Sequence, residues 1–249
     1  MNDTYFSGQG DIYIAPVVNG LTTRGLRPVG TCDKLEFGND QTFDEIHETS
    51  TGNSYVDARV ATKTLPKITM NLKKWSIENL MDALYGTSEG PQEGGSATGV
   101  QLRAFPDSYV DLPHQNVSAV VLTAGATPLV AGTDYTLDAK NGMIRILPGS
   151  TVVAGPGPTV VSAAYTYAGF AGDVHAFSTG AQEYTIRLVG INRNDPTAPV
   201  IVDVFRVQLD LTKTLNLIDE KHGSLSLGGM ILRDATRPSG SEFFKIRKN

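Results

Sequence analysis

The segment Lys63–Gly86, KTLPKITMNLKKWSIENLMDALYG, joins a strand pattern directly to a helix pattern. Across Pro66–Lys73 apolar and polar residues alternate with a period of two, which predicts a half-buried strand. After Trp75 the apolar residues recur at helical spacing, Ser76 can cap the start of the helix, and Gly86 stands where a left-handed residue is expected. No other segment offers a comparable helix, so the rest of the chain must supply strands that pack against this unit.

The two faces of the predicted strand differ in chemistry. One face carries lysine, threonine and asparagine side chains, whereas the other is expected to pack against the apolar face of the helix. The residues predicted to form this helix–sheet core are Ile68, Met70, Leu72, Leu80, Met81 and Leu84. The arrangement predicts a mainly β protein with one flanking α-helix.

Composition excludes several classes of protein. The 249 residues carry a net charge of −5, so the chain as a whole would be repelled by nucleic acid or by an anionic membrane. Cys32 is the single cysteine, which excludes an internal disulfide and fits folding in a reducing cytoplasm. The sequence has neither a leader pattern nor an apolar run near the roughly 18 residues that span a bilayer. We therefore expect neither secretion nor membrane insertion.

Two shorter strand patterns and a long polar stretch precede the segment that joins strand to helix. The strands are predicted at Gly10–Val18 and Pro28–Phe37. Between Gly38 and Thr62 the chain is polar, with several acidic residues and few apolar anchors. Polar stretches of this length inside compact domains are usually functional loops or disordered segments. We therefore expect a long loop that projects from one end of a hairpin.

A glycine-rich stretch after the helix predicts a domain boundary. The stretch Thr87–Gly99, TSEGPQEGGSATG, has the composition of a linker, and strand patterns follow it. We predict an inserted small β lobe at residues 97–170, within a discontinuous core of residues 1–96 and 171–249. Inside the lobe, Asn141-Gly142 predicts a two-residue hairpin turn that needs positive φ at both positions.

Long strands are predicted to return to the core after the lobe. They lie at Glu183–Gly190, Val200–Leu211 and Ser224–Leu232. The last of them contains Gly228-Gly229 and is expected to bend or bulge at these glycines. Phe243 and Phe244 near the end of the chain predict a tail that docks onto the core.

The chain carries no catalytic or metal-binding motif. Its four histidines are scattered, and none has a partner at metal-ligand spacing. Asp134, Asp138 and Asn141 have the wrong spacing for a calcium loop, and a turn-forming role explains them better. The acidic residues at 44–48 are interpreted as solvated charge rather than as paired catalytic carboxylates. We predict no enzymatic activity, no metal site and no cofactor.

The order of the predicted elements and three stretches of sequence carry a resemblance to a known family. The stretches are KITMNLKKWSIENLMDALYG at 67–86, AGTDYTLDAKNGMIRIL at 131–147 and YTIRLVGINRNDPTAPVIVDVFRVQLDLTKTLNLI at 184–218. This pattern resembles the major tail tube proteins of long-tailed, siphovirus-like bacteriophages over most of the chain. The resemblance implies a barrel-forming antiparallel β-sandwich flanked by one helix. In such proteins hexameric rings stack into a hollow tube through which DNA leaves the capsid.

The same resemblance implies roles for particular residues. The side chains that would line the bore are Glu36, Lys67, Thr69, Asn71, Lys73 and Arg187. The loop that would contact the next ring includes Phe43, Asp44, Glu45, Ile46 and Tyr55. We expect this loop to be mobile in the monomer. Lys67 and Lys73 would place positive charge in the bore, which conflicts with a conduit that should not hold DNA. Neighbouring acids such as Glu36 would have to neutralise them.

Partners and location also follow from the resemblance. The expected partners are further copies of the chain, a tail-tip initiator, a tape-measure protein and a tail terminator. DNA would pass through the tube without specific binding, and no membrane partner is expected. The expected location is the tail of the virion, after assembly in the cytoplasm of the bacterial host.

Two other classes of function stay open. The inserted lobe could be a carbohydrate- or surface-binding β module on a scaffold, although Trp75 is the only tryptophan and exposed aromatic clusters are scarce. Alternatively, the core could form the inner tube of a contractile secretion system, which is a related assembly.

Overall fold

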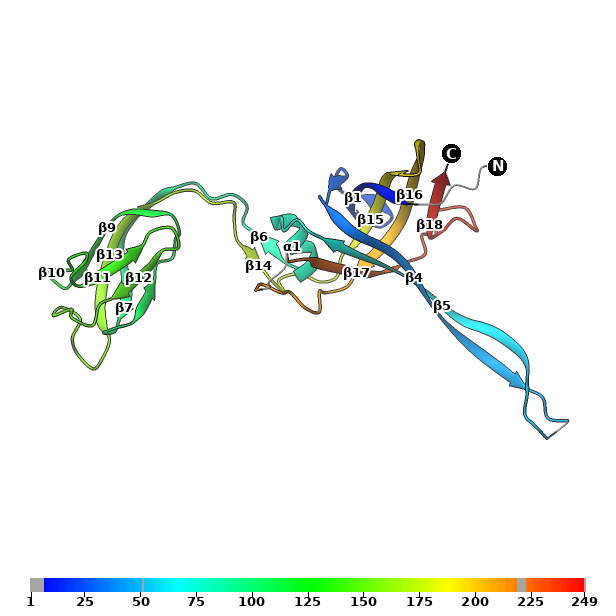
Figure 1. Cartoon of the computed structure of the whole chain (residues 1–249), viewed down its shortest axis with the longest axis horizontal. Coiled ribbons are helices and arrows are strands. Elements are labelled where there is room, and N and C mark those ends of the chain that lie inside the picture. Colours follow the sequence, from blue (N-terminus) through cyan, green and yellow to red (C-terminus); the bar gives the residue numbers. More distant parts are fainter. Residues whose placement is uncertain (1–6, 51, 219–222, 249) are drawn as a thin grey trace. The chain divides into compact units, whose positions relative to one another are not determined.

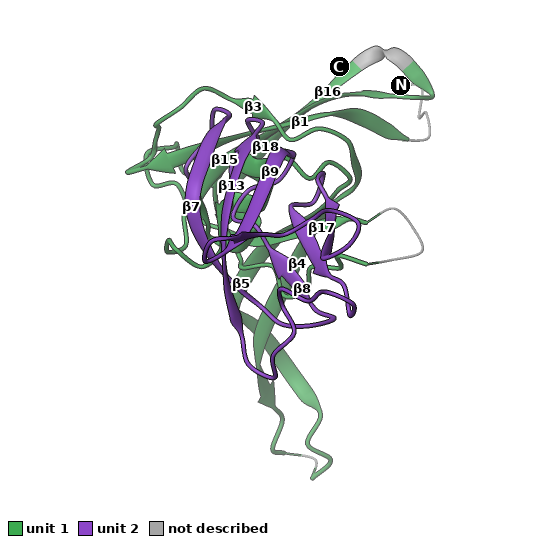
Figure 2. Cartoon of the chain, turned by 90° about the vertical axis from the view of Figure 1, so that its left-hand side faces the viewer, with its two compact units in different colours: residues 1–88, 174–249 green, residues 89–173 purple. Residues whose placement is uncertain are grey.

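The computed structural model describes residues 7–50, 52–218 and 223–248, with the backbone alone at 196–198. Within these ranges the protein is mainly β, with antiparallel sheets and one α-helix, which confirms the predicted fold class. The chain divides into two compact units, residues 1–88 with 174–249 and residues 89–173 (Figure 2). The second unit therefore interrupts the first, as an inserted lobe does.

A nine-stranded antiparallel sheet forms the first unit. The strand order is β2-β1-β15-β16-β17-β5-β4, with β3 beside β1 and β18 beside β16 (Figure 1). The strands are β1 (Gly8–Val18), β2 (Leu21–Thr22), β3 (Arg27–Pro28), β4 (Cys32–His47), β5 (Val56–Leu72), β15 (Glu183–Asn192), β16 (Asp195–Leu209), β17 (Leu225–Ile231) and β18 (Phe244–Lys248). Two very short strands, β6 (Thr87–Ser88) and β14 (Val174–His175), pair with each other where the chain leaves and re-enters this unit.

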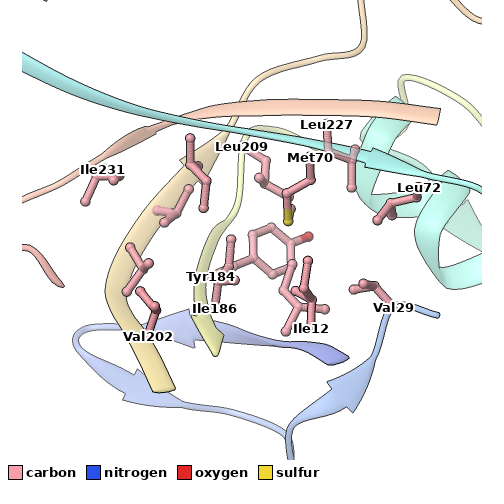
Figure 3. Close-up of a cluster of buried hydrophobic side chains, with 14 of the residues drawn as sticks. Ile12, Val29, Met70, Leu72, Tyr184, Ile186, Val202, Leu209, Leu227 and Ile231 are labelled. Atoms are coloured by element: carbon pink, nitrogen blue, oxygen red, sulfur yellow. The ribbon is translucent and has the colours of Figure 1, made fainter. Parts of the chain in front are cut away.

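The large sheet folds over one hydrophobic core. Inward side chains of β1, β15 and β16 face those of β5 and β17 across this core (Figure 3). Ile14 and Ile186 from one side, and Met70 and Leu227 from the other, are almost completely buried. Because side chains alternate along a strand, the neighbours of these residues point away from the core. The two layers therefore have outer faces that are free to be polar.

The helix α1 (Ile77–Leu84) begins as predicted but ends differently. Ser76 caps it, since its Oγ accepts the Asn79 N–H at 3.2 Å. The left-handed residue at the other end is Tyr85, with φ 48°, so the prediction for Gly86 is wrong. The Tyr85 hydroxyl donates to a backbone carbonyl of β16, which anchors the residue in this conformation. At Gly86 a Cβ would lie 3.0 Å from the His175 carbonyl oxygen. Glycine at this position therefore lets the backbone of residue 175 lie close to that of residue 86.

The helix buries a face that is rotated from the predicted one. Five of the six predicted residues lie in or against the core: Ile68, Met70, Leu72, Leu80 and Leu84. Met81 is only half-buried and lies outside this cluster, whereas Asn79 and Ala83 are completely buried. The Asn79 amide donates to the Val29 carbonyl at 2.9 Å and accepts from Arg27 at 2.7 Å. These bonds satisfy a buried polar side chain, so the helix docks through asparagine where a purely apolar face was predicted.

Strand β17 passes its two glycines without a bulge. A bend or bulge was predicted at Gly228-Gly229; the register with β5 is unbroken from Leu225 to Met230, so the bulge is wrong. A Cβ on Gly229 would lie 2.5 Å from the Gln208 carbonyl oxygen of β16. This glycine therefore permits close approach of the neighbouring strand.

The C-terminal tail docks onto the sheet, as predicted. Strand β18 pairs with residues 200–204 of β16, and Phe244 stacks on Phe37 of β4 with the ring centres 5.4 Å apart. On the outer face, Asp203 of β16 pairs with Arg247 of β18. An apolar contact and an ion pair thus hold this strand from both faces.

The inserted lobe consists of two antiparallel sheets around its own hydrophobic core. One sheet has the order β10-β9-β13-β7 and the other has the order β11-β12-β8. The strands are β7 (Gly95–Ala104), β8 (Tyr109–Asp111), β9 (Val117–Ala124), β10 (Thr127–Pro128), β11 (Tyr135–Asp138), β12 (Met143–Ile146) and β13 (Thr159–Tyr167).

The lobe is slightly larger than predicted, and its hairpin turn is different. It spans residues 89–173 rather than 97–170, because Gly95 and the residue after it are paired in β7 and are not linker. The β11–β12 hairpin encloses residues 139–142, and of the two predicted positions only Gly142 has positive φ. Asn141 instead donates its side-chain amide to Asp138 at 2.7 Å, which explains both residues as turn formers.

Asp134 is expected to make the lobe sensitive to acid. Its buried carboxylate accepts the Val130 N–H and the Ser150 hydroxyl, both at 2.8 Å, and these hydrogen bonds lower its pKa from the ordinary value of 3.8. A carboxyl with a lowered folded-state pKa stabilises the fold above its unfolded pKa and loses that contribution as the pH falls through the folded value.

The change Asp134→Asn should therefore speed hydrogen exchange in lobe peptides at neutral pH, and the difference from wild type should shrink as the pH falls below the ordinary aspartate pKa of 3.8. The matched control is Asp107→Asn, whose carboxylate is exposed and lies 3.4 Å from Arg145. Equal exchange rates for wild type and Asp134→Asn at neutral pH would contradict this assignment.

Candidate assembly surface

A long two-stranded ribbon replaces the loop predicted at residues 38–62. Strands β4 and β5 stay paired from Cys32↔Leu72 to His47↔Val56, with register shifts at three places. The part beyond the core, Gly38–His47 with Val56–Thr64, is called the ribbon below, and it leads away from the rest of the sheet (Figure 1). The predicted loop is therefore confined to the short connection at the tip, and its predicted position at the end of a hairpin is confirmed.

In the described part of the chain, no protein layer covers either face of the ribbon. Apart from Glu48, every described residue from 44 to 64 is exposed. Several of these are apolar: Ile46, Tyr55, Val56 and Val60 are each half-exposed or more. An isolated two-stranded hairpin is marginally stable in water, and exposed apolar clusters mark interaction surfaces. The ribbon is therefore the best candidate in the described chain for a surface that a partner covers.

The structure brings the predicted stacking residues together on the ribbon. Phe43, Asp44, Glu45 and Ile46 are consecutive in β4, and Tyr55 immediately precedes β5. The pairing register places Ile46 on the same face as Val60, while Phe43 and Glu45 share the other face with Arg59. The Arg59 guanidinium lies 3.6 Å from the centre of the Phe43 ring and 3.5 Å from the Glu45 carboxylate. One face thus carries Ile46 and Val60 together with Asp44, and the other carries a cation–π pair.

Sequence reasoning missed Val56, Arg59 and Val60 as part of this surface. The β-branched residues of VDARVATKT, residues 56–64, were the available strand signal. Neither face of the ribbon is buried by the chain itself, so the apolar alternation that marks a half-buried strand is absent here.

Most of the residues predicted to line a bore share one outer face. Glu36 of β4 lies opposite Thr69 of β5, and Lys67, Asn71 and Lys73 follow the same alternation, away from the buried side chains of β5. The lysines of this face are paired: Lys67 with Asp40, Lys73 with Asp33 at 2.9 Å, and Lys34 with Glu36 at 2.9 Å. The two conflicting lysines are thus neutralised, although Glu36 itself pairs with a different lysine.

Arg187 does not belong to this group. It lies on β15, which β16 and β17 separate from β5 in the sheet order, so it does not share a face with the other five residues. Its Nε is 2.8 Å from the Asp203 carboxylate, which also binds Arg247. Arg187 therefore helps to hold β18 on the opposite layer.

Neither a metal centre nor a membrane helix is present in residues 7–50, 52–218 and 223–248. These residues contain no group of three or more histidine, cysteine, aspartate or glutamate side chains that could hold a metal ion. Across the same ranges, no helix combines the length and the apolar character needed to cross a membrane.

Comparison with known proteins gives a family but no activity. No curated protein matches the chain. A family model matches residues 5–247, which is nearly the whole sequence. The chain therefore belongs to the family described as protein of unknown function UCP028589.

Proposed function

We propose that this chain is a virion structural protein whose copies form rings that stack into the hollow tail tube of a bacteriophage. The observation that carries the proposal is the ribbon, which extends a core strand pair into solvent with apolar side chains on its surface. The order of sequence elements that resembles tail tube proteins is an independent support. The tube would serve as the conduit for DNA ejection.

The free edges of the sheet support self-assembly. Within the described residues β4 is an edge strand along its whole length, since only β5 pairs with it. Edge strands offer unpaired backbone groups to another chain, and closing them into a barrel removes the exposed edges. Neighbouring copies in a ring would complete this edge, and the ribbon would reach the next ring. Both contacts are heterologous, which means that they join different surfaces of two copies. The contact through the β4 edge would close into a ring, whereas the contact through the ribbon would repeat along the tube.

The outer face of β4 and β5 has the chemistry that a DNA conduit needs. Each phosphate neutralised by a lysine or arginine adds salt-dependent affinity that must be broken as the DNA moves. Lys67 and Lys73 are paired with aspartates, and the whole chain carries a net charge of −5. A bore lined by this face would therefore hold DNA weakly.

The proposal implies a set of partners and a location. A tail-tip initiator would start the first ring, a tape-measure protein would set the length, and a terminator would close the tube. Assembly would take place in the host cytoplasm, and the product would be part of the virion. The number of subunits in a ring, six, comes from the resemblance.

Negative-stain electron microscopy of the purified protein over a range of concentrations, with light scattering for the soluble mass, tests the proposal. Rings or hollow tubes of uniform bore are expected, because the ribbon and the free edges are then covered. A monomer at every concentration that also fails to add onto isolated tail tips would contradict the proposal.

A further inference from the structure

We propose that the ribbon of one copy docks in a groove beside strand β18 of a second copy. This inference rests on the proposed function and names the surface that receives the ribbon. The groove has a volume of about 1160 Å³ and is lined by residues of β1, β4, β15, β16 and β18. It lies wholly within the first unit, as the ribbon does.

The groove has an apolar lining with uncovered side chains. Leu188 and Val200 line it from β15 and β16, and Phe37 lines it from β4. Ile191 is 41% exposed and Ile246 of β18 is 57% exposed, although both lie at the groove. Apolar side chains of this kind gain free energy when a partner removes them from water.

The chain cannot fill this groove with its own ribbon. Strand β4 forms one wall of the groove through residues 32–37 and continues directly into the ribbon. Both views show the ribbon leading away from β1 and β18 (Figures 1 and 2). A ribbon that occupies the groove must therefore come from another copy.

Charge favours the ribbon as the occupant. Residues 43–60 contain four carboxylates and one arginine, so the end of the ribbon is acidic. Strand β18, FKIRK, contains three basic residues and no acid; Arg247 pairs with Asp203 on the outer face, and Lys248 is the base that lies at the groove. Lys248 of this strand and Arg193, just beyond β15, both line the groove. Of the acids that also line it, Asp33 and Glu36 on the β4 wall are paired with lysines, and the third is Asp11 of β1. Opposite charges steer association and fix its register, in addition to the apolar contact.

The ribbon and the groove both expose apolar side chains. The ribbon face that carries Ile46 and Val60, with Asp44 beside them, offers β-branched side chains to a groove whose apolar lining includes Leu188, Val200, Ile246 and Phe37. Each copy has one ribbon and one groove, so the contact is head-to-tail and leaves a free ribbon at one end and a free groove at the other. Such a contact adds copies along one direction, as a stack of rings requires.

A mixing experiment with full-length variants tests the inference. The change Ile46→Asp with Val60→Asp disables the ribbon but leaves the groove, and Ile246→Asp with Lys248→Glu disables the groove but leaves the ribbon. Each variant alone should sediment as a single layer, which is either a monomer or a ring. The mixture should sediment with twice the mass of that single layer. The contact in the mixture should weaken at high salt, because salt screens exposed charges. Urea denaturation of each variant checks that it folds like wild type.

Cysteine cross-linking supplies a second readout. In a Cys32→Ser background, Val60→Cys with Ile246→Cys should give a ladder of disulfide-linked oligomers, whereas either cysteine alone should give dimers at most. The matched control replaces Val60→Cys by Val121→Cys, an equally exposed valine on the lobe, and should give no ladder.

The outcomes separate this inference from the proposed function. If wild type forms tubes but the mixture does not double in mass and no ladder forms, the groove assignment is overturned and the tube stands. If the mixture doubles in mass while wild type never forms rings or tubes, even on tail tips, the groove assignment stands and the tube is overturned.

Discussion

The change Ile46→Asp with Val60→Asp is expected to abolish tube formation while leaving the free energy of unfolding of the subunit within about 1 kcal/mol of wild type. Both side chains are 53% exposed and lie on the same face of the ribbon, so the subunit alone gains little from them. In a tube they would be covered by the next copy, and a carboxylate buried without a partner is strongly unfavourable. Negative-stain microscopy counts the tubes, and urea denaturation gives the free energy of unfolding.

The control adds the same charges at an equally exposed apolar site. Val121 and Val160 of the lobe are each 56% exposed, so Val121→Asp with Val160→Asp changes the net charge of the chain by the same amount. This variant should form tubes at the wild-type concentration. Loss of tubes in both variants would show that general charge repulsion, and not the ribbon, governs assembly.

The change Gly229→Ala should destabilise the first unit by about 3 kcal/mol. The new Cβ would lie 2.5 Å from the Gln208 carbonyl oxygen and 3.0 Å from the Leu209 Cα. Both atoms belong to the backbone of β16, so β17 and β16 would have to separate in the middle of the sheet. Urea denaturation should show a lower midpoint with little change in slope.

The adjacent glycine is a matched control. At Gly228 the nearest atom to a new Cβ is the Ile68 carbonyl oxygen, 3.9 Å away, which is ordinary contact. Gly228→Ala should leave stability unchanged or raise it by roughly 0.4–1 kcal/mol, because alanine restricts the unfolded chain. Equal losses in the two variants would mean that strand conformation rather than close approach selects glycine here.

Local patterns predicted the elements that bury one face. The alternation in Pro66–Lys73 predicted the inner half of β5, and the spacing after Trp75 predicted α1 with its Ser76 cap. The strand predicted at Glu183–Gly190 lies within β15, which spans Glu183–Asn192. These predictions succeed because burial on one face imposes a period on the sequence, and the period can be read without knowing the partner.

Other features depend on neighbours that are distant in the sequence. Gly229 is needed because β16 lies against it, and Asn79 can be buried because Val29 and Arg27 supply its hydrogen-bond partners. Arg187 carries the same signal as any outward polar residue of a strand, and only the strand order places it in the other layer. The partner in each case is brought close by the fold and not by sequence spacing.

Some features of the candidate assembly surface follow from the sequence, and others follow only from the fold. The sequence alone determined that residues 38–62 are polar, acidic in their first half and attached to one end of a strand pair. Only the tertiary structure decided that they continue β4 and β5 as a paired ribbon, and that the lysines beside it are neutralised by Asp33 and Asp40. The physical reason is that backbone hydrogen bonds between two strands form whatever the side chains are, so a ribbon covered on neither face leaves no hydrophobic period in its sequence.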